Sequence, residues 1–329
     1  MSISKSLQGQ LSVPVICAPL FIISNPDLVV AQCKAGLLGS FPALNARPAE
    51  ELEVWLTRIE TELAAARAAD PTACIAPYAV NQIVHDTNSR LRHDIDACVR
   101  HRVPVMITSL KAPYEVVEAA HQYGGLVFHD VINARHARKA IEAGVDGLIL
   151  VSSGAGGHAG TLNPFALVAE VREFYDGPIA LSGSITKGSQ VLSAQAMGAD
   201  FAYIGTRFIA TTEARADDAY KQMLIDSRAD DIVYSSLFTG VHGNYLRGSI
   251  ERAGLDPAAL AAGDKSNMNF DGLAGVGSGT AKAWRDIWGA GQGVGSIKDV
   301  VPAAEAGRRL VAEYREALRA AQALALECA

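Results

Sequence analysis

The amino-acid sequence predicts an α/β protein, built as a (β/α)8 TIM barrel with a small, mostly helical cap domain. Short β-branched runs alternate with alanine-rich helical stretches through the first 228 residues. Several of these runs lack polar alternation, which is typical of parallel strands that are covered by helices. Eight strand–helix units in about 225 residues fit a closed barrel more economically than a doubly wound sheet.

The expected elements alternate along the chain. We expect strands at residues 13–17, 37–41, 74–80, 105–108, 126–129, 147–151, 179–182 and 201–205. We expect helices at 27–34, 50–69, 90–100, 115–122, 134–143, 165–174, 189–197 and 217–227, the last being counted as the eighth helix of the barrel. The helix at 50–69 places Trp55, Ile59 and Leu63 on one face, as a helix that packs on a sheet requires.

The pattern changes beyond residue 228. Residues 229–301 carry spaced glycines and short helical pieces without a strand pattern, which predicts a small cap or lid. Residues 302–326 read as one amphipathic helix that packs on the barrel or forms a dimer surface. We therefore predict a barrel at 1–228, a cap at 229–301 and a C-terminal helix at 302–329. Polar runs at 239–247 and 264–270, which include Tyr245 and Phe270, fit either a ligand-contacting lid or a solvated loop.

Composition and charge exclude several classes of protein. With 49% apolar residues, a chain of 329 residues buries a large core, which excludes disorder and small disulfide scaffolds. The 29 Lys and Arg against 35 Asp and Glu give a net charge of −6 without basic runs, which argues against nucleic acid or an anionic membrane as partner. The apolar segment 11–23 is interrupted by Pro14 and Pro19 and is too short to span a bilayer. A small-molecule substrate is the expected partner.

Cysteine and histidine spacing bears on compartment and metal content. The five cysteines are odd in number, scattered and without a C-x-x-C pair, which favours buried thiols in a reducing cytoplasm over a disulfide framework. The eight histidines include no H-E-x-x-H or H-x-H cluster. The sequence thus predicts a cytoplasmic protein without a metal centre.

Two glycine-containing turns follow the seventh and eighth expected strands. They read Ser182-Gly183-Ser184 and Gly205-Thr206. In a TIM barrel the active site lies at the carboxyl ends of the strands, commonly with a phosphate site after strands 7 and 8. Glycines let backbone N–H groups approach an anion, and the N-terminus of the following helix adds a favourable dipole. A cofactor with a phosphate tail, such as FMN, is therefore expected there.

A third glycine-rich loop follows the sixth expected strand and presents one histidine. Gly156 and Gly157 precede His158, and Gly160 follows it. The G-x-G-x-x-x-G spacing differs from the dinucleotide-binding fingerprint. An imidazole at the mouth of a barrel can act as a general base or acid near neutral pH, whereas the alternative is a loop histidine bonded to backbone. We take His158 as the candidate catalytic residue.

These motifs resemble the FMN-dependent nitronate monooxygenase (2-nitropropane dioxygenase) family. The resemblance rests on A-G-G-H-A-G at 155–160, the turn at Gly183 and G-T-R-F at 205–208. Segments 13–20, 25–28 and 35–39 match the N-terminal signature of that family, so the resemblance covers residues 13 to about 212. The family also contains NAD(P)H:quinone reductases and flavin-dependent enoyl-ACP reductases, so the motifs identify the family rather than the reaction.

The resemblance implies roles for individual residues. His158 would face the substrate side of the flavin, and His129 would tune the flavin or bind substrate, unless it is a core histidine. Ser184 stands where relatives carry a second glycine, and its hydroxyl can also donate to phosphate. The residues implied in FMN binding are Ala18, Pro19, Leu20, Asn81, His129, Gly156, Gly157, Ser182, Gly183, Ser184, Gly205 and Thr206.

Three functions follow from the resemblance. The first is a nitronate monooxygenase, in which His158 removes the α-proton of a nitroalkane and oxygen chemistry yields a carbonyl compound and nitrite. The second is a flavin reductase of quinones or enoyl thioesters, with NAD(P)H as transient reductant. The third is a flavin-binding protein without turnover. If the C-terminal helix forms a dimer surface, the protein would be a homodimer.

Overall fold

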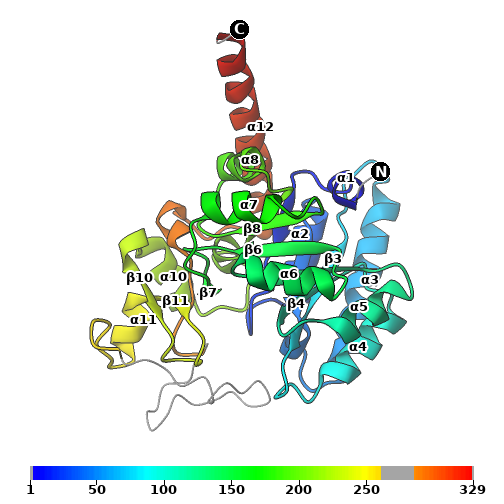
Figure 1. The fold of residues 1–329 in the computed structure, drawn as a ribbon, viewed down its shortest axis with the longest axis horizontal. Coiled ribbons are helices and arrows are strands. Elements are labelled where there is room, and N and C mark those ends of the chain that lie inside the picture. Colours follow the sequence, from blue (N-terminus) through cyan, green and yellow to red (C-terminus); the bar gives the residue numbers. More distant parts are fainter. Residues whose placement is uncertain (1–2, 261–284, 328–329) are drawn as a thin grey trace.

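The computed structural model describes residues 3–260 and 285–327, and it confirms the TIM barrel (Figure 1). Eight parallel strands form one sheet in the order β1-β9-β8-β6-β5-β4-β3-β2. A parallel bridge between Ile16 and Leu38 joins the two edge strands, so the sheet closes on itself. The strands are β1 (Val15–Cys17), β2 (Gly39–Pro42), β3 (Tyr78–Val84), β4 (Val105–Leu110), β5 (Leu126–Val131), β6 (Gly147–Val151), β8 (Ile179–Ser182) and β9 (Phe201–Ile204).

The barrel interior is filled by one side of each strand. Ile107, Phe128, Ile149 and Phe201 are fully buried in this inner cluster, and the rings of Phe128 and Phe201 meet edge to face with centroids 6.3 Å apart. The short helix α1 (Ile3–Gln8) contributes Leu7 to the same cluster. The opposite side of each strand packs against the helices, because side chains alternate across a strand. Both faces are therefore apolar, which explains the lack of polar alternation in the sequence.

Seven of the expected barrel helices are present, with ends within a few residues of those predicted. Three of them begin at an asparagine whose side chain accepts a hydrogen bond from a backbone N–H of the first turn: Asn25, Asn133 and Asn163. The helices are α2 (Pro26–Lys34), α3 (Glu51–Ala69), α4 (Leu91–Arg100), α5 (Tyr114–His121), α6 (Ala134–Glu142), α7 (Pro164–Arg172) and α8 (Gly188–Ala196).

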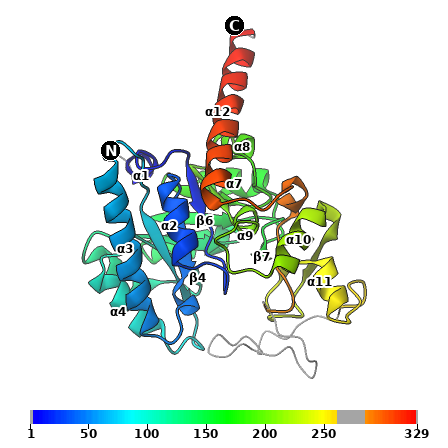
Figure 2. The same ribbon diagram turned by 180° about the vertical axis from the view of Figure 1, so that it is seen from behind.

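The eighth helix of the barrel is not the one that the sequence indicated. The chain after β9 forms only the short helix α9 (Thr206–Ile209), and α10 (Asp218–Asp226) packs on the cap, where the rings of Tyr220 and Trp288 stack at 4.7 Å. The C-terminal helix α12 (Ala303–Glu327) lies instead against α8 and α2. Its far end extends away from the barrel (Figures 1 and 2).

The third strand is displaced from its expected position at 74–80. It begins at Tyr78 and continues to Val84, where it still pairs with β4. Pro77 has no N–H to donate to the sheet, so the ladder starts after it. Asn81, expected at the end of this strand, consequently lies in its middle.

The cap contains strands that the sequence did not indicate. β10 (Ile232–Ser235) pairs antiparallel with β11 (Gly243–Leu246), and β11 pairs with β7 (Gly157–His158) from the loop after β6. The described part of the cap also holds the 3-10 helices η2 (Ala229–Asp231) and η4 (Gln292–Ser296) and the helix α11 (Arg247–Arg252). The polar run at 264–270 lies outside the described residues. No helix in the described ranges combines the length and apolarity needed to cross a membrane.

Candidate active site

A cavity of about 420 Å³ lies where the carboxyl ends of the barrel strands meet the cap. Its volume falls in the range of roughly 300–1,000 Å³ that is typical of small-molecule sites. Residues of β2, β3, β4, β5, β6, β8 and β9 and the segment that follows β1 line it from the barrel, and the loop after β6 and the segment 289–293 line it from the cap side. The sequence-predicted residues that line it are Ala18, Pro19, Leu20, Asn81, Gly156, Gly157, His158, Ser182, Gly183, Ser184, Gly205 and Thr206.

The turn after β8 has a backbone conformation that few residues adopt. Gly183 has φ +133°, and a Cβ there would lie 2.3 Å from Ser152 Oγ, so only glycine fits. Ser184 has φ +58°, the left-handed region that is uncommon for residues with a side chain. In the turn after β9, Thr206 Oγ1 accepts a hydrogen bond from the N–H of Gly291 at 2.9 Å, which leaves its own hydroxyl hydrogen to donate.

The N-terminus of α8 is already satisfied by protein side chains. The N–H of Gly188 donates to Glu313 Oε2 at 2.7 Å, and the N–H of Lys187 donates to Gln190 Oε1 at 3.0 Å. The expected contribution of this helix N-terminus to an anion site is therefore limited. The two turns, with their backbone N–H groups and the hydroxyls of Ser184 and Thr206, remain the candidate phosphate contacts.

A hydrogen-bonded loop supports the wall formed by residues 18–20. Asn45 Nδ2 donates to the carbonyl oxygens of Leu20 and Ser24 at 2.9 and 2.8 Å, and Asn45 Oδ1 accepts from the N–H of Ile22 at 2.8 Å. On the opposite wall, Asn81 Nδ2 donates to the carbonyl of Ile107 at 3.3 Å. These contacts fix the backbone around the cavity.

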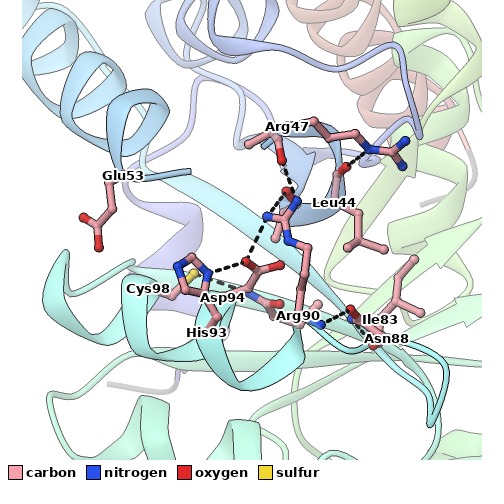
Figure 3. A network of polar contacts seen from close by, with 12 residues as sticks. Leu44, Arg47, Glu53, Ile83, Asn88, Arg90, His93, Asp94 and Cys98 are labelled. Atoms are coloured by element: carbon pink, nitrogen blue, oxygen red, sulfur yellow. Dashed lines mark hydrogen bonds and ion pairs between the residues drawn. The ribbon is translucent and has the colours of Figure 1, made fainter. Parts of the chain in front are cut away.

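The loop that carries Asn45 is itself held by Arg90 (Figure 3). Its guanidinium donates to the carbonyl oxygens of Ala46 at 2.6 Å and Ala43 at 3.4 Å, and to the carboxylate of Asp94 at 2.9 Å. Asp94 is fully buried. The half-buried Arg90 thus ties the start of α4 to the loop after β2. Pro42, at the end of β2, lines the cavity.

His158 is held in place by the cap. It belongs to β7, where it pairs with Gly243 of β11, and its Nε2 lies 2.9 Å from Thr239 Oγ1. The Thr239 hydroxyl donates its single hydrogen to the carbonyl of Val241 at 3.0 Å. Its oxygen is then the acceptor for the Nε2–H of His158, and this contact orients the imidazole. Burial lowers the pKa of His158 to about 4. The imidazole is therefore neutral at physiological pH and able to accept a proton.

His129 is the one predicted site residue that does not line the cavity. Its Nδ1 lies 2.8 Å from Thr108 Oγ1, and burial, together with the nearby His136, lowers its pKa to about 4. Side chains alternate along β5, and because Leu126 and Phe128 face the barrel interior, His129 faces the helices. His129 is thus packed behind the sheet, away from the cavity.

Asp130, the neighbour of His129, lines the cavity in its place. Burial raises the pKa of its carboxyl to about 7, and Oδ1 has no hydrogen-bond partner among the described residues. The alternation of β5, counted from Phe128, is the signal that could have found this residue. Gly289, Gly291 and Gly293 were also missed, because they reach the site only through the folding of the cap. Thr239 belongs to the polar run 239–247, which the sequence offered as a ligand-contacting lid or a solvated loop, and it contacts His158.

A metal site needs clustered ligands, and thiol chemistry needs an accessible thiolate. Its His, Cys, Asp and Glu side chains form no group of three that could hold a metal ion. Cys17 is fully buried, and burial raises the pKa of its thiol well above the usual value, so its thiolate is disfavoured.

Comparison with known proteins places the chain in a family. The model described as nitronate monooxygenase matches residues 5–313. A nitronate monooxygenase of Neurospora crassa is 26% identical over 94% of this chain and 91% of its own length. A (3aS,4S,5R,7aS)-5-hydroxy-7a-methyl-1-oxo-octahydro-1H-indene-4-carboxyl-CoA dehydrogenase of Rhodococcus jostii is 26% identical over 80% of this chain and 71% of its own length.

Solved structures share the same fold. FabK from Thermotoga maritima aligns with a TM-score of 0.75 at 21% identity, over 97% of this chain and 98% of that one. A nitroalkane oxidase from Streptomyces ansochromogenes aligns with a TM-score of 0.77 at 24% identity, over 96% and 99%. The family model spans most of the chain, and its members are flavin-dependent oxidoreductases. The chain belongs to the nitronate monooxygenase family.

Proposed function

We propose that this protein is an FMN-dependent nitronate monooxygenase that oxidises alkyl nitronates with O2 to a carbonyl compound and nitrite. The observation that carries the proposal is His158, a neutral imidazole that the cap presents to a cavity at the strand ends. The family and the curated relatives named nitronate monooxygenase support the same reaction.

The residues around the cavity fit FMN. Gly183 and Ser184 adopt left-handed backbone conformations in the turn after β8, and a Cβ at Gly183 would collide with Ser152. Such a turn, next to that of Gly205 and Thr206, offers N–H and hydroxyl donors to a phosphate without using a charged side chain. Residues 18–20 and Asn81 would then hold the ring. Bound FMN would supply the electron acceptor and O2 the final oxidant.

His158 would act on neutral nitroalkanes as a general base. The α C–H bond breaks, its electron pair forms the C=N bond of the nitronate, and the proton moves to the imidazole. A base with a pKa of about 4 is weak in the free protein. The anion formed beside it stabilises the imidazolium and raises its pKa during the transfer, since the cavity screens the two charges poorly. Thr239 keeps the ring in the orientation that this step needs.

A second function is favoured by one comparison. The Rhodococcus jostii relative is named as a dehydrogenase of a CoA ester, and the family includes other oxidoreductases. The corresponding alternative here is an NAD(P)H-dependent reductase of quinones or enoyl thioesters. In that reaction His158 would position the acceptor or supply a proton. Because its pKa is about 4, the imidazole carries no extra proton at neutral pH, so it is poorly suited to the second role.

Anaerobic reduction of the FMN-loaded protein separates the two functions. For a nitronate monooxygenase, we expect ethyl nitronate to bleach the flavin absorbance rapidly, and NADH and NADPH to bleach it slowly or not at all. Rapid bleaching by NADPH and none by the nitronate would replace the first function with the second. A protein that takes up no FMN would contradict both.

A further inference from the structure

The floor of the cavity holds an acid that the proposed reaction does not yet use. Asp130 lies on β5, where Leu126 and Phe128 face the barrel interior, so its carboxyl reaches the uppermost layer of that interior. It lines the same cavity as His158. Tyr203 of β9 lines the cavity beside it, and burial together with the Asp130 charge raises the pKa of the Tyr203 hydroxyl.

In the described part of the chain, no positive charge compensates this carboxyl. The titratable side chains that share the cavity are His136 from α6, His158 from β7, Tyr203 from β9 and Tyr220 from α10, and none forms an ion pair or hydrogen bond with Asp130. Among the described residues, neither a lysine nor an arginine lines the cavity. Oδ1 is buried, and no residue within the ranges 3–260 and 285–327 gives it a hydrogen bond. An uncompensated buried carboxylate is costly, which favours the neutral acid, whose O–H is a hydrogen-bond donor.

We propose that the Asp130 carboxyl is an acid of this site, which donates a hydrogen bond from the cavity floor to an electron-rich atom of the bound ligand. This inference rests on the proposed function for the identity of the ligand. The acceptor has one chemistry and two sources: a ring heteroatom of bound FMN, or an oxygen of the nitro or nitronate group. Both acquire negative charge during the reaction, and a neutral donor strengthens its hydrogen bond as that charge develops.

The ionised form of Asp130 has the opposite effect. A carboxylate accepts hydrogen bonds and cannot donate them, and in a poorly screened cavity it repels an anion. Burial places the pKa of the carboxyl at about 7, so the change occurs near neutral pH. The site should therefore bind electron-rich or anionic ligands more tightly below that pH than above it.

Infrared difference spectra between about pH 5 and about pH 9 test for the acid directly. We expect a protonated carboxyl C=O band that titrates near neutral pH in the apoprotein. Asp130→Asn should abolish this band and retain an N–H donor of similar size. Asp176→Asn, at an exposed position outside the cavity, serves as the matched control and should retain it. If Asp130→Asn fails to fold, Asp130→Ser replaces it. A wild-type protein without such a band would overturn the proposal.

Two measurements on the FMN-loaded protein identify the acceptor. If it belongs to the flavin, the midpoint potential should change its pH dependence near neutrality in the wild type and not in Asp130→Asn. If it is a substrate oxygen, the Kd of nitrate, a planar probe anion, should rise about tenfold per pH unit above the transition in the wild type only. Identical pH dependences in both proteins, or tighter binding at high pH, would refute the role of Asp130.

Neither measurement requires turnover of a nitronate. A protein that is reduced by NADPH alone would refute the proposed function and leave the carboxyl band, the potential and the nitrate titration interpretable. Conversely, rapid bleaching by ethyl nitronate with no titrating band would refute only the role of Asp130.

Discussion

His158 lies in β7, which pairs with a strand of the cap, and its pKa is lowered by burial. This lowered pKa predicts the pH dependence of the reaction. Burial disfavours the imidazolium, so the imidazole stays neutral down to about pH 4 in the free protein, where an exposed histidine would already be protonated. We expect kcat/KM for neutral nitroethane to remain on its high-pH plateau until about pH 5 and to fall below it. A profile that falls near pH 6.5, the usual range of histidine, would contradict this assignment.

Removal of the imidazole should separate neutral from anionic substrates. His158→Ala should lower kcat/KM for neutral nitroethane by about 10²–10⁴-fold, because general-base catalysis is lost. Ethyl nitronate carries no α-proton that must be removed, so its turnover should fall much less. His121→Ala, whose ring lies on α5 beside Asp146, is the control histidine. Equal losses for the two substrates would indicate a binding role for His158.

At the scale of elements, the eighth position of the barrel is occupied by α12. The N-terminus of α8 packs against it closely: a Cβ added to Gly188 would lie 2.2 Å from the carbonyl oxygen of Leu310 and 2.3 Å from the backbone nitrogen of Tyr314. The two helices are also joined by a hydrogen bond from Tyr314 Oη to Gln195 at 2.6 Å. Because both close contacts are backbone atoms, a side chain at Gly188 can be accommodated only if the helices move apart.

Gly188→Ala should therefore destabilise the protein, although alanine normally favours a helix. Overpacking of this kind costs about 1–3 kcal/mol in the free energy of unfolding. The midpoint of thermal unfolding should fall by several degrees, as circular dichroism can record. Gly295→Ala is the matched control, because a Cβ there meets its neighbours only at ordinary contact distances of 3.6 Å and more. An unchanged midpoint for Gly188→Ala would show that α12 does not pack on α8 as described.

The cap shows the same dependence on partners as α12. β7 has only two residues, and it is a strand because β11 pairs with it. The pairing fixes His158, and Thr239 completes its orientation from the same part of the chain. The catalytic candidate is therefore positioned by an element that follows it far along the sequence.

For the whole molecule, the cavity between barrel and cap links ligand binding to stability. Residues of the segment 289–293 line it together with the strand ends, and Gly291 donates to Thr206 of the turn after β9. A ligand that contacts both parts binds only the folded protein. FMN at a concentration 100 times its Kd should raise the free energy of unfolding by about 2.7 kcal/mol.

Riboflavin separates the contribution of the phosphate turns from that of the ring. It lacks the phosphate, so at equal concentration it should raise the midpoint of thermal unfolding less than FMN does. Equal shifts for both ligands would show that the turns at Gly183 and Gly205 do not hold a phosphate. The measurement is a thermal melt of the apoprotein with each ligand and requires no catalytic activity.

The sequence by itself determined the barrel and pointed to the loops at its mouth. Strand–helix alternation follows from the local pattern of apolar and polar residues. The backbone conformation at Gly183 favours glycine. Both features can therefore be read from short stretches of sequence. The turns around Gly183 and Gly205 and the loop of His158, which the sequence singled out, all line one cavity.

Only the tertiary structure decided which side chains enter that cavity and which elements complete the barrel. Both faces of β5 are buried, so hydrophobicity does not show which face is the inner one. Alternation places His129 and Asp130 on opposite faces, and the closed barrel decides that Asp130, like Phe128, faces inward to the cavity. The pairing of β7 with β11 and the docking of α12 on α8 join segments far apart in the chain. Such contacts gain their free energy from burial and pairing across the folded molecule, so a local pattern of residues can indicate a helix or an apolar face but not the element that it meets.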